Sequence, residues 1–250
     1  MRKFFFLIFV IPAMICSAQE TPREKNWNFL TNLYLLFPNM NGETGIGDIT
    51  APIDANTGDV FSKLKFGGML YFEAQTKKWA ITSDLVFMNL ENELTPTTLV
   101  NEGFANANQG IWENAGLYRI LPFLEIGAGG RLNHLYTFIY ARRNVFPAGT
   151  EEVSREASAT WFDPIIIARL SADIKDKWLF QARGDIGGFG VGSKLTWQLQ
   201  GYAGYRFSKV FQLTAGYRII SIDYEKSTDS QPFIFNIDEF GPVIRFGFNF

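Results

Sequence analysis

Apolar and polar residues alternate along the end of the chain, Phe240–Phe250. Counting back from the last residue in steps of two gives an apolar, mostly aromatic face: Phe250, Phe248, Phe246, Ile244, Pro242 and Phe240. The opposite face is small or polar and includes Arg245, with Glu239 next in the same series. A period of two predicts a β-strand between two different environments. An aromatic outer face opposite a polar inner face is typical of a transmembrane β-barrel.

Nine earlier segments repeat this alternation: Trp27–Phe37, Phe66–Gln75, Trp79–Asn89, Ile111–Ile120, Phe123–Phe138, Trp161–Ala172, Trp178–Ile186, Leu195–Phe207 and Phe211–Ile222. Short turns at Thr76, Leu121, Lys175 and Ser208 alternate with longer polar stretches that begin at Pro38, Leu90, Ala141 and Lys226. Short periplasmic turns and long outer loops are the rule for barrels of this kind. We therefore predict an all-β fold, a single antiparallel transmembrane β-barrel of about ten strands, with eight or twelve as alternatives.

The longest polar stretch, Pro38–Lys65, is expected to form the first outer loop. It contains a short extended piece near Ile46–Ile53 and a helical turn near Val60–Leu64. A full crossing by the extended piece would make the strand number odd, so we place it over or inside the barrel mouth. Leu90–Gln109 and Ala141–Glu156 are predicted to be further polar loops.

Composition agrees with a barrel, because 16% of the 250 residues are aromatic and 19% are charged. Beyond residue 15 no apolar run approaches the roughly 18 residues of a membrane helix. The N-terminus has the pattern of an export signal: Arg2 and Lys3, an apolar core at Phe4–Ile15, and small residues up to Ala18. We expect residues 1–18 to be a signal peptide and residues 19–250 to form the barrel in the outer membrane of a Gram-negative bacterium.

Charged residues on the inner face are the candidate site. They are Glu73, Asp84, Glu113, Arg119, Glu125, Arg131, Arg169, Arg183, Asp185, Arg206, Arg218, Glu239 and Arg245. An Arg or Lys facing lipid costs about 2–4 kcal/mol at the bilayer midplane, which favours the shared inward parity. Two interpretations remain open. The charges line a lumen that selects solutes, or they form ion pairs that fill a narrow barrel.

The glycine-rich segment Gly184–Ser193, G-D-I-G-G-F-G-V-G-S, resembles a phosphate-binding loop only superficially. It lacks the Gly-Lys-Ser/Thr ending and opens no helix. We interpret it as a strand end that bends into a tight hairpin, where glycine permits unusual dihedral angles.

The same segment begins a series of motifs: Thr196-Trp197, Tyr205–Phe207, Gly216–Arg218, Asp223-Tyr224, Gly241-Pro242 and the final Phe250, with Phe72–Ala74 and Trp79–Leu85 upstream. Together they resemble a widespread family of Gram-negative outer-membrane β-barrel proteins. The resemblance covers most of the chain after residue 18 and is weakest at Leu90–Asn108. It implies a barrel in the outer membrane and no particular activity.

Little in the sequence favours an enzyme. His134 is the only histidine and is predicted to face outward near the outer interface. A lipid-modifying enzyme would pair such a histidine with a serine, but no Ser-centred G-x-S-x-G motif is present. Cys16 is the only cysteine and lies in the predicted signal peptide, so we expect no disulfide, metal site or cofactor.

Three functions follow, in order of preference. The first is a small-solute channel, porin-like or plugged, with a charged lumen. The second is a non-conducting structural or surface-binding barrel, and the third a lipid-modifying enzyme at His134. The expected partners are outer-membrane lipids and lipopolysaccharide, the barrel-assembly machinery and, for an open lumen, small solutes. The formal charge of −2 does not suggest a nucleic acid partner.

Overall fold

The computed structural model describes residues 27–46, 49–93, 100–145, 149–226 and 233–250. Twelve antiparallel strands form one sheet, with one short helix, α1, at Thr57–Lys63. The strands are β1 Asn28–Leu36, β2 Asn39–Ile46, β3 Ile49–Ala55, β4 Leu64–Gln75, β5 Trp79–Glu93, β6 Val100–Leu121, β7 Leu124–Asn144, β8 Thr150–Ile174, β9 Trp178–Gly187, β10 Leu195–Arg206, β11 Phe211–Lys226 and β12 Phe233–Asn249. The predicted signal peptide lies outside the described residues.

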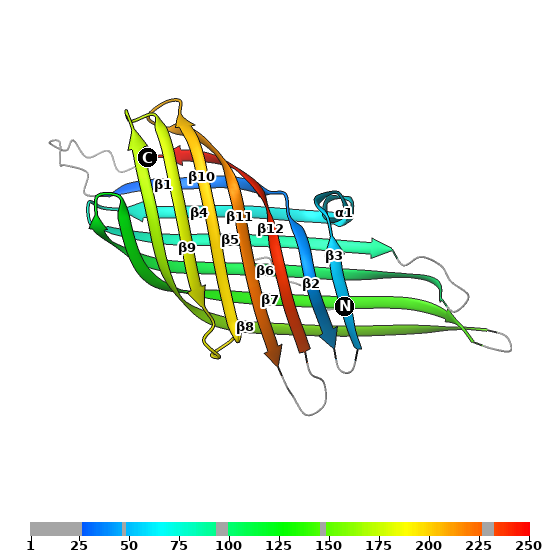
Figure 1. Cartoon of the computed structure of the whole chain (residues 1–250). Helices are drawn as coiled ribbons and strands as arrows, with labels where there is room; N and C mark the ends of the chain where they lie inside the picture. The colour runs from blue at the N-terminus through cyan, green and yellow to red at the C-terminus, as the bar shows by residue number, and fades with distance from the viewer. Residues whose placement is uncertain (1–26, 47–48, 94–99, 146–148, 227–232) are drawn as a thin grey trace, which may run out of the picture.

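All strands except β2 and β3 form a closed ring (Figure 1). Consecutive strands pair as neighbours from β4 to β12, and β12 then pairs with β1 from Leu30↔Asn249 to Leu36↔Val243. Closure bonds the backbone of the first and last strands, as a barrel in lipid requires. The prediction of an antiparallel transmembrane barrel with about ten strands is confirmed.

The prediction that Pro38–Lys65 is an outer loop is wrong. β2 and β3 form a hairpin within this segment, and β2 pairs with β12 from Asn39↔Phe240 to Ile46↔Phe233. Phe37 N donates to Pro242 O at 2.9 Å, whereas Pro38 has no N–H to donate. β2 thus takes over the place of β1 beside β12, and the hairpin extends the wall instead of covering the mouth.

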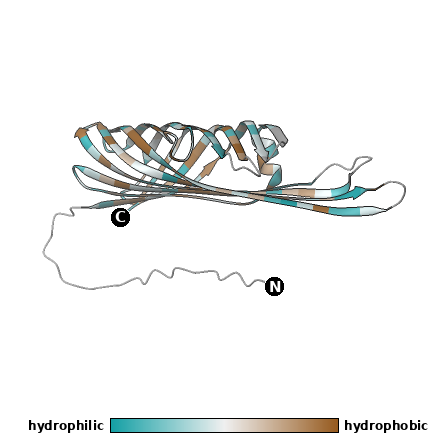
Figure 2. Ribbon diagram, turned by 90° about the horizontal axis from the view of Figure 1, so that it is seen from below, coloured by the Kyte–Doolittle hydropathy of each residue, from teal (hydrophilic) through white to brown (hydrophobic). Residues whose placement is uncertain are grey.

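Two further predicted loops, Leu90–Gln109 and Ala141–Glu156, are largely strand. β6, β7 and β8 have 22, 21 and 25 residues, whereas β9 has 10 and β10 has 12. The three long strands project beyond the ring as a sheet, which we call the blade (Figures 1 and 2). The alternation was missed because both faces of a strand can be polar or small once it leaves the membrane.

The outer surface of the ring carries an apolar band. Leu33, Leu85, Phe162, Leu199 and Phe246 are all exposed on it. Near the short turns, aromatic rings pair around the wall: Phe29 with Phe250 at 5.8 Å between centroids, Trp79 with Tyr118 at 4.8 Å, Trp178 with Tyr205 at 5.2 Å and Phe211 with Phe248 at 5.6 Å. Such an aromatic girdle marks a membrane interface.

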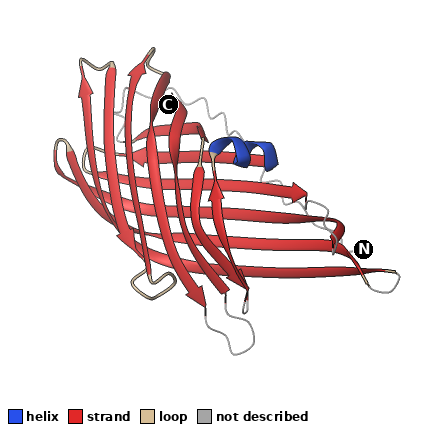
Figure 3. Cartoon of the chain, turned by 45° about the vertical axis from the view of Figure 1, so that its right-hand side comes forward, coloured by secondary structure: helices blue, strands red, loops and turns tan. Residues whose placement is uncertain are grey.

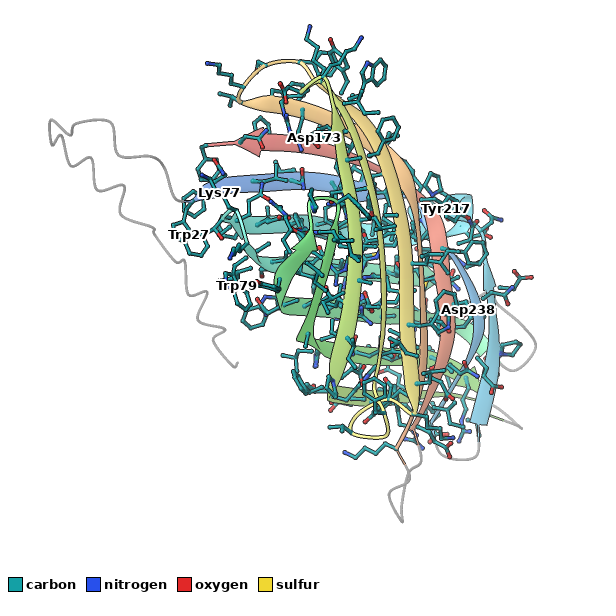
Figure 4. All side chains as sticks on the ribbon, turned by 60° about the vertical axis from the view of Figure 1, so that its left-hand side comes forward. Trp27, Lys77, Trp79, Asp173, Tyr217 and Asp238 are labelled. Atoms are coloured by element: carbon teal, nitrogen blue, oxygen red, sulfur yellow. The ribbon has the colours of Figure 1, made fainter. Side chains whose placement is uncertain are left out.

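Figure 4 locates the two ends of this band. Trp27 and Trp79 lie near Lys77 at the end with the short turns, the periplasmic end by the barrel rule. Tyr217 and Asp238 lie farther along the outer surface. Because Tyr217 pairs with Pro242 and Asp238 pairs with Ser221, Asp238 is four residues beyond Tyr217 on the wall. An exposed carboxylate there places the outer edge of the apolar band between these two residues.

Beyond this edge the inward face of the wall becomes apolar and the outward face becomes polar. On β11 the inward residues are polar up to Arg218, and then Ile220, Ile222 and Tyr224 are buried inward. On β12, Phe233, Phe235 and Ile237 are buried inward while Asn236 and Asp238 are exposed. The ring therefore has a polar interior inside the membrane and an apolar interior above it, where its outer face meets water.

The helix α1 lies between the hairpin and β4 (Figure 3). Asn56 caps it: the Asn56 side chain accepts from Asp59 N, and the Asp59 side chain accepts from Asn56 N, a reciprocal capping box. In the described part of the chain no helix is long and apolar enough to span a bilayer.

Substitution of Phe246 by Arg tests the position of the band. The charge would face hydrocarbon, so the free energy of folding into liposomes should fall by about 2–4 kcal/mol. Asp238→Arg, on the same strand and face but above the band, is the matched control and should fold with wild-type yield. Folding is read from the heat-shifted band on gels. Equal folding of the two variants would contradict the assigned membrane edge.

Candidate functional site

The charged residues predicted from parity all point into the ring or lie at its periplasmic rim. All of them are buried except Arg119 and Arg206, which are half-buried at the rim. Most of them form three groups, while Arg206 pairs with Asp173 at the rim and Glu239 accepts a hydrogen bond from Gln109.

The central group is built around Arg131 on β7, whose side chain is fully buried. Its Nη2 lies 2.7 Å from both Glu113 Oε2 and Asp185 Oδ1, and its Nη1 donates to Thr196 Oγ1 at 3.1 Å. Arg183 also binds Glu113, and its Nη2 lies 3.4 Å from Asp185. The guanidinium of Arg131 thus joins strands β6, β9 and β10 across the interior.

The second group lies nearer the periplasmic end. Arg169 on β8 donates to Glu73 on β4 through two nitrogens, at 2.7 and 2.9 Å, and to Glu125 on β7 at 2.6 Å. Glu125 also forms an ion pair with Arg119, whose Nη2 lies 2.8 Å from Glu125 Oε1. The Tyr71 hydroxyl donates to Glu73 Oε2 at 2.5 Å. Because β8 and β4 are separated by three strands on the ring, this ion pair crosses the lumen.

The third group combines arginines and tyrosines. Tyr34 donates to Asp84 at 2.6 Å, and Arg218 Nη1 lies 3.1 Å from the Tyr34 hydroxyl and 3.4 Å from Asp84. Arg245 packs over the ring of Tyr202 at 3.6 Å, and the rings of Tyr34 and Tyr71 are each 5.4 Å away.

Arg245 differs from the other buried arginines. Its Nη2 donates to Gln200 Oε1 at 3.0 Å and to the Tyr202 hydroxyl at 2.7 Å, while its Nε has no partner. Among the described residues it forms no ion pair with a carboxylate. Cation–π contacts take the place of a counter-ion here.

Arg218 and Arg245 do not lie at the similar depth that their places on adjacent strands suggested. Arg245 pairs with Thr214, which is four residues from Arg218 along β11. Four residues of strand correspond to about 13 Å. Their backbone positions are therefore offset along the wall, although both guanidinium groups reach Tyr34.

Sequence reasoning missed Asp163, a fully buried carboxylate on β8. It accepts from Ser193 N at 2.6 Å, Ser193 Oγ at 2.9 Å, Asn133 at 2.8 Å and Trp161 at 3.1 Å. Its odd number on the strand gives it the inward parity of Arg169, a signal that could have found it.

The contacts of Asp163 also explain the glycine-rich segment. Gly188 and Gly190 have φ angles of 83° and 75°, and a Cβ on Gly192 would lie 2.4 Å from the Phe162 carbonyl oxygen. The segment is a tight hairpin between β9 and β10, as interpreted from the sequence, and it is fastened to the wall through Ser193.

Above the ion pairs the interior is filled by apolar side chains. Trp161 stacks on Tyr224 with 3.9 Å between ring centroids, and Phe235 lies 6.1 Å from Trp161. Ile220, Ile222 and Ile237 belong to the same buried cluster. Glu239 lies between the two layers, buried, with Gln109 as its hydrogen-bond partner at 3.5 Å.

A cavity of about 370 Å³ occupies the periplasmic end of the lumen. Its wall includes Tyr71, Arg169, Tyr202 and Arg245, and its rim includes Arg206 and Asp173, which form an ion pair at 3.0 Å. The cavity is polar and ends at the layer of tyrosines and arginines. From there outward, ion pairs and then the apolar cluster lie inside the ring.

His134 is exposed on the outer face of β7. Its Nδ1 lies 2.7 Å from Thr160 Oγ1 on β8, rather than beside a serine. No group of side chains in the described ranges has the composition of a metal site.

Comparisons with known proteins find similar structures but no similar sequence. No family model matches the sequence, and a search of curated proteins finds no similar sequence. Similar solved structures include the monoaromatic hydrocarbon channel CymD, at 8% identity over 90% of this chain and 88% of that chain, with a TM-score of 0.38. The toluene transporter TbuX of Ralstonia pickettii is 7% identical over 90% of this chain and 89% of that chain, with a TM-score of 0.39. Ail, the attachment invasion locus protein of Yersinia pestis, is 8% identical over 90% of this chain and 99% of that chain, with a TM-score of 0.34. At these scores they say nothing about activity, and the barrel fold rests on the strand pairing itself.

Two arginines provide a matched test of the ion pairs. Arg131→Ala leaves Glu113 and Asp185 buried with one fewer cation, so it should lower the free energy of unfolding by about 3–5 kcal/mol. Arg245→Ala strands no carboxylate and should lower it by only about 1–2 kcal/mol, the scale of a cation–π contact. Denaturant unfolding of the barrel in liposomes measures both.

A rescue variant separates charge from packing. Adding Glu113→Gln and Asp185→Asn to Arg131→Ala removes the stranded charges and should recover part of the lost stability. Equal losses in Arg131→Ala and Arg245→Ala, without recovery in the triple variant, would show that the ion pairs do not stabilise the interior.

Proposed function

We propose that this protein is an outer-membrane β-barrel of the porin-like kind whose pore is plugged at rest. The observation that supports the proposal is the Arg131 cluster, in which side chains from β6, β7, β9 and β10 meet in the centre of the ring. Small solutes reach the polar cavity at the periplasmic end, whose inner wall is formed by Tyr71, Tyr202 and Arg245, and the Arg131 cluster blocks the lumen beyond it.

Two barriers in series close the path. The first consists of the ion pairs, which leave no charged group of the cluster free to attract a passing ion. The second is the apolar layer of Trp161, Ile220, Ile222 and Tyr224, which excludes water. Hydrophobic constrictions of this kind gate channels by dewetting.

The lipid-facing band and the short turns support a place in the outer membrane of a Gram-negative bacterium. Lipids and lipopolysaccharide then contact the outer face, and the barrel-assembly machinery inserts the chain. Export by the signal peptide at residues 1–18 belongs to the same proposal.

A second candidate function, surface binding, is favoured by the blade. Its outer face carries Phe104, which packs 5.8 Å from Phe138 and 5.7 Å from Tyr140, measured between ring centroids. Nearer the tip, Arg142 bridges Glu102 at 2.7 Å and Glu152 at 2.9 Å, and its hydrogen bond lowers the pKa of Glu152. A rigid, exposed sheet of this kind offers a surface for a partner outside the cell.

Conductance in planar bilayers decides between the two. Wild-type protein should give no stable current steps. A plug variant with Arg131, Arg183, Glu113 and Asp185 all replaced by Ala removes the cluster without leaving a charge unpaired, and it should conduct in steps once voltage wets the apolar layer. If this variant shows the heat-shifted band of a folded barrel and stays silent, the barrel is structural and the proposal is wrong.

A further inference from the structure

The hydrogen-bonded wall has a seam between β1 and β4. Their pairing ends at Leu33↔Leu70. Farther out, the edge of β4 at Leu64–Met69 has no described strand partner on this side, and neither has the outer edge of β3. The seam lies within the apolar band, because Gly68 on β4 pairs with Phe87, whose ring is exposed on the outer face of β5.

The helix α1 occupies this seam in place of a strand. Val60 is buried toward the interior, whereas Phe61 is exposed and stacks on Phe37 with 5.3 Å between ring centroids. A helix satisfies its own backbone groups, so it can close a gap that has no strand to complete the ladder.

Side-chain hydrogen bonds attach the helix to the hairpin side of the seam. On the hairpin side, Thr57 N donates to Asn39 Oδ1 at 3.0 Å and Thr57 Oγ1 donates to Phe37 O at 3.1 Å. Toward β4, a cavity of about 60 Å³ lies between α1, β1 and β4 and is lined by Gly67 and Gly68. No hydrogen bond among the described residues joins α1 to these two glycines, so a ligand meets no backbone ladder there.

Both ends of the cavity are apolar. Leu35 and Phe61, which line it, are 51% and 40% exposed, which makes its mouth continuous with the lipid-facing band. Its inner end is formed by Leu36, Val60 and Met88 beside the apolar interior. Except for Tyr34, whose hydroxyl is bonded to Asp84 and Arg218, the lining side chains are apolar, so a hydrocarbon chain meets mostly apolar groups along this route.

We propose that this seam binds an acyl chain of an outer-leaflet lipid, whose end enters sideways between α1 and β4. The cavity has the volume of about two water molecules, enough for the tip of a chain. The paired glycines let the chain pass close to the backbone of β4. The site opens to lipid and not to the periplasmic cavity, and Tyr34 is the residue through which it adjoins the Asp84–Arg218 ion pair.

Photolabelling from lipid tests the site. The wild-type barrel is folded into liposomes that contain a phospholipid with a diazirine near the end of one acyl chain, and labelled positions are mapped by mass spectrometry. Val60 and Met88 should be labelled several-fold more than Leu117 and Ile167, which are also buried inward but lie on fully paired strands.

Matched glycine variants make the test specific. Gly68→Trp fills the mouth, and an added Cβ there meets no atom within 4 Å, so the barrel should fold while Val60 and Met88 lose their label. Gly201→Trp is the control, because Gly201 is also open and outward but lies on β10 between two paired neighbours. It should leave the labelling unchanged.

Three results would overturn the proposal. In the first, Val60 and Met88 are labelled no more than Leu117 and Ile167. In the second, Gly68→Trp and Gly201→Trp give the same labelling. In the third, a soluble diazirine alcohol labels Val60 and Met88 as strongly as the lipid does, which would identify a dissolved apolar molecule as the occupant instead of a lipid chain.

Discussion

Backbone groups in hydrocarbon must find their hydrogen bonds within the protein, and the rest of this structure depends on that constraint. β1 and β12 satisfy it by closing the ring, although they stand at opposite ends of the described chain. Where the ring cannot close with a strand, above Leu33, the chain provides a helix whose backbone bonds are internal. The hairpin β2–β3 and α1 therefore belong to the wall and not to a loop above it.

Closure also decides where charges lie. Lipid on the outside leaves the interior as the place for arginines and carboxylates, and a narrow ring brings them into contact across the lumen. Burial of a charge is tolerated only with a partner, so nearly every buried arginine meets a carboxylate and Arg245 meets three tyrosine rings. Above the membrane the outer face is in water and the interior reverts to an ordinary apolar core. From the periplasmic end outward, the interior thus changes from polar, through ion pairs, to apolar.

The sequence predicts the features that follow from parity. Alternation identifies the ring strands, and the inward positions of residues such as Arg131, Arg169 and Asp185 agree with the structure. Parity does not show how deep an inward side chain lies in the barrel or which residue it pairs with. Arg218 and Arg245 sit about 13 Å apart because register depends on strand pairing. Alternation does not reveal the strands of the blade, because outside the lipid apolar residues are no longer required on one face. Asp163 has the inward parity, but its partners Asn133, Trp161 and Ser193 are all neutral. The sequence therefore gives no opposite charge with which to pair it.

In the proposed closed barrel, water enters the lumen from the periplasmic end and does not pass the change from polar to apolar interior. Single cysteines along β11 and β12 test it directly, with Cys16 removed or replaced so that no other thiol is present. A water-soluble maleimide should label a cysteine at Gln212, facing the cavity, and at the exposed Asp238 on the outer wall. It should leave cysteines at Ile220 and Ile222 unlabelled from either side of the membrane. Rapid labelling at Ile220 and Ile222 in a folded barrel would mean that the lumen is a continuous aqueous pore.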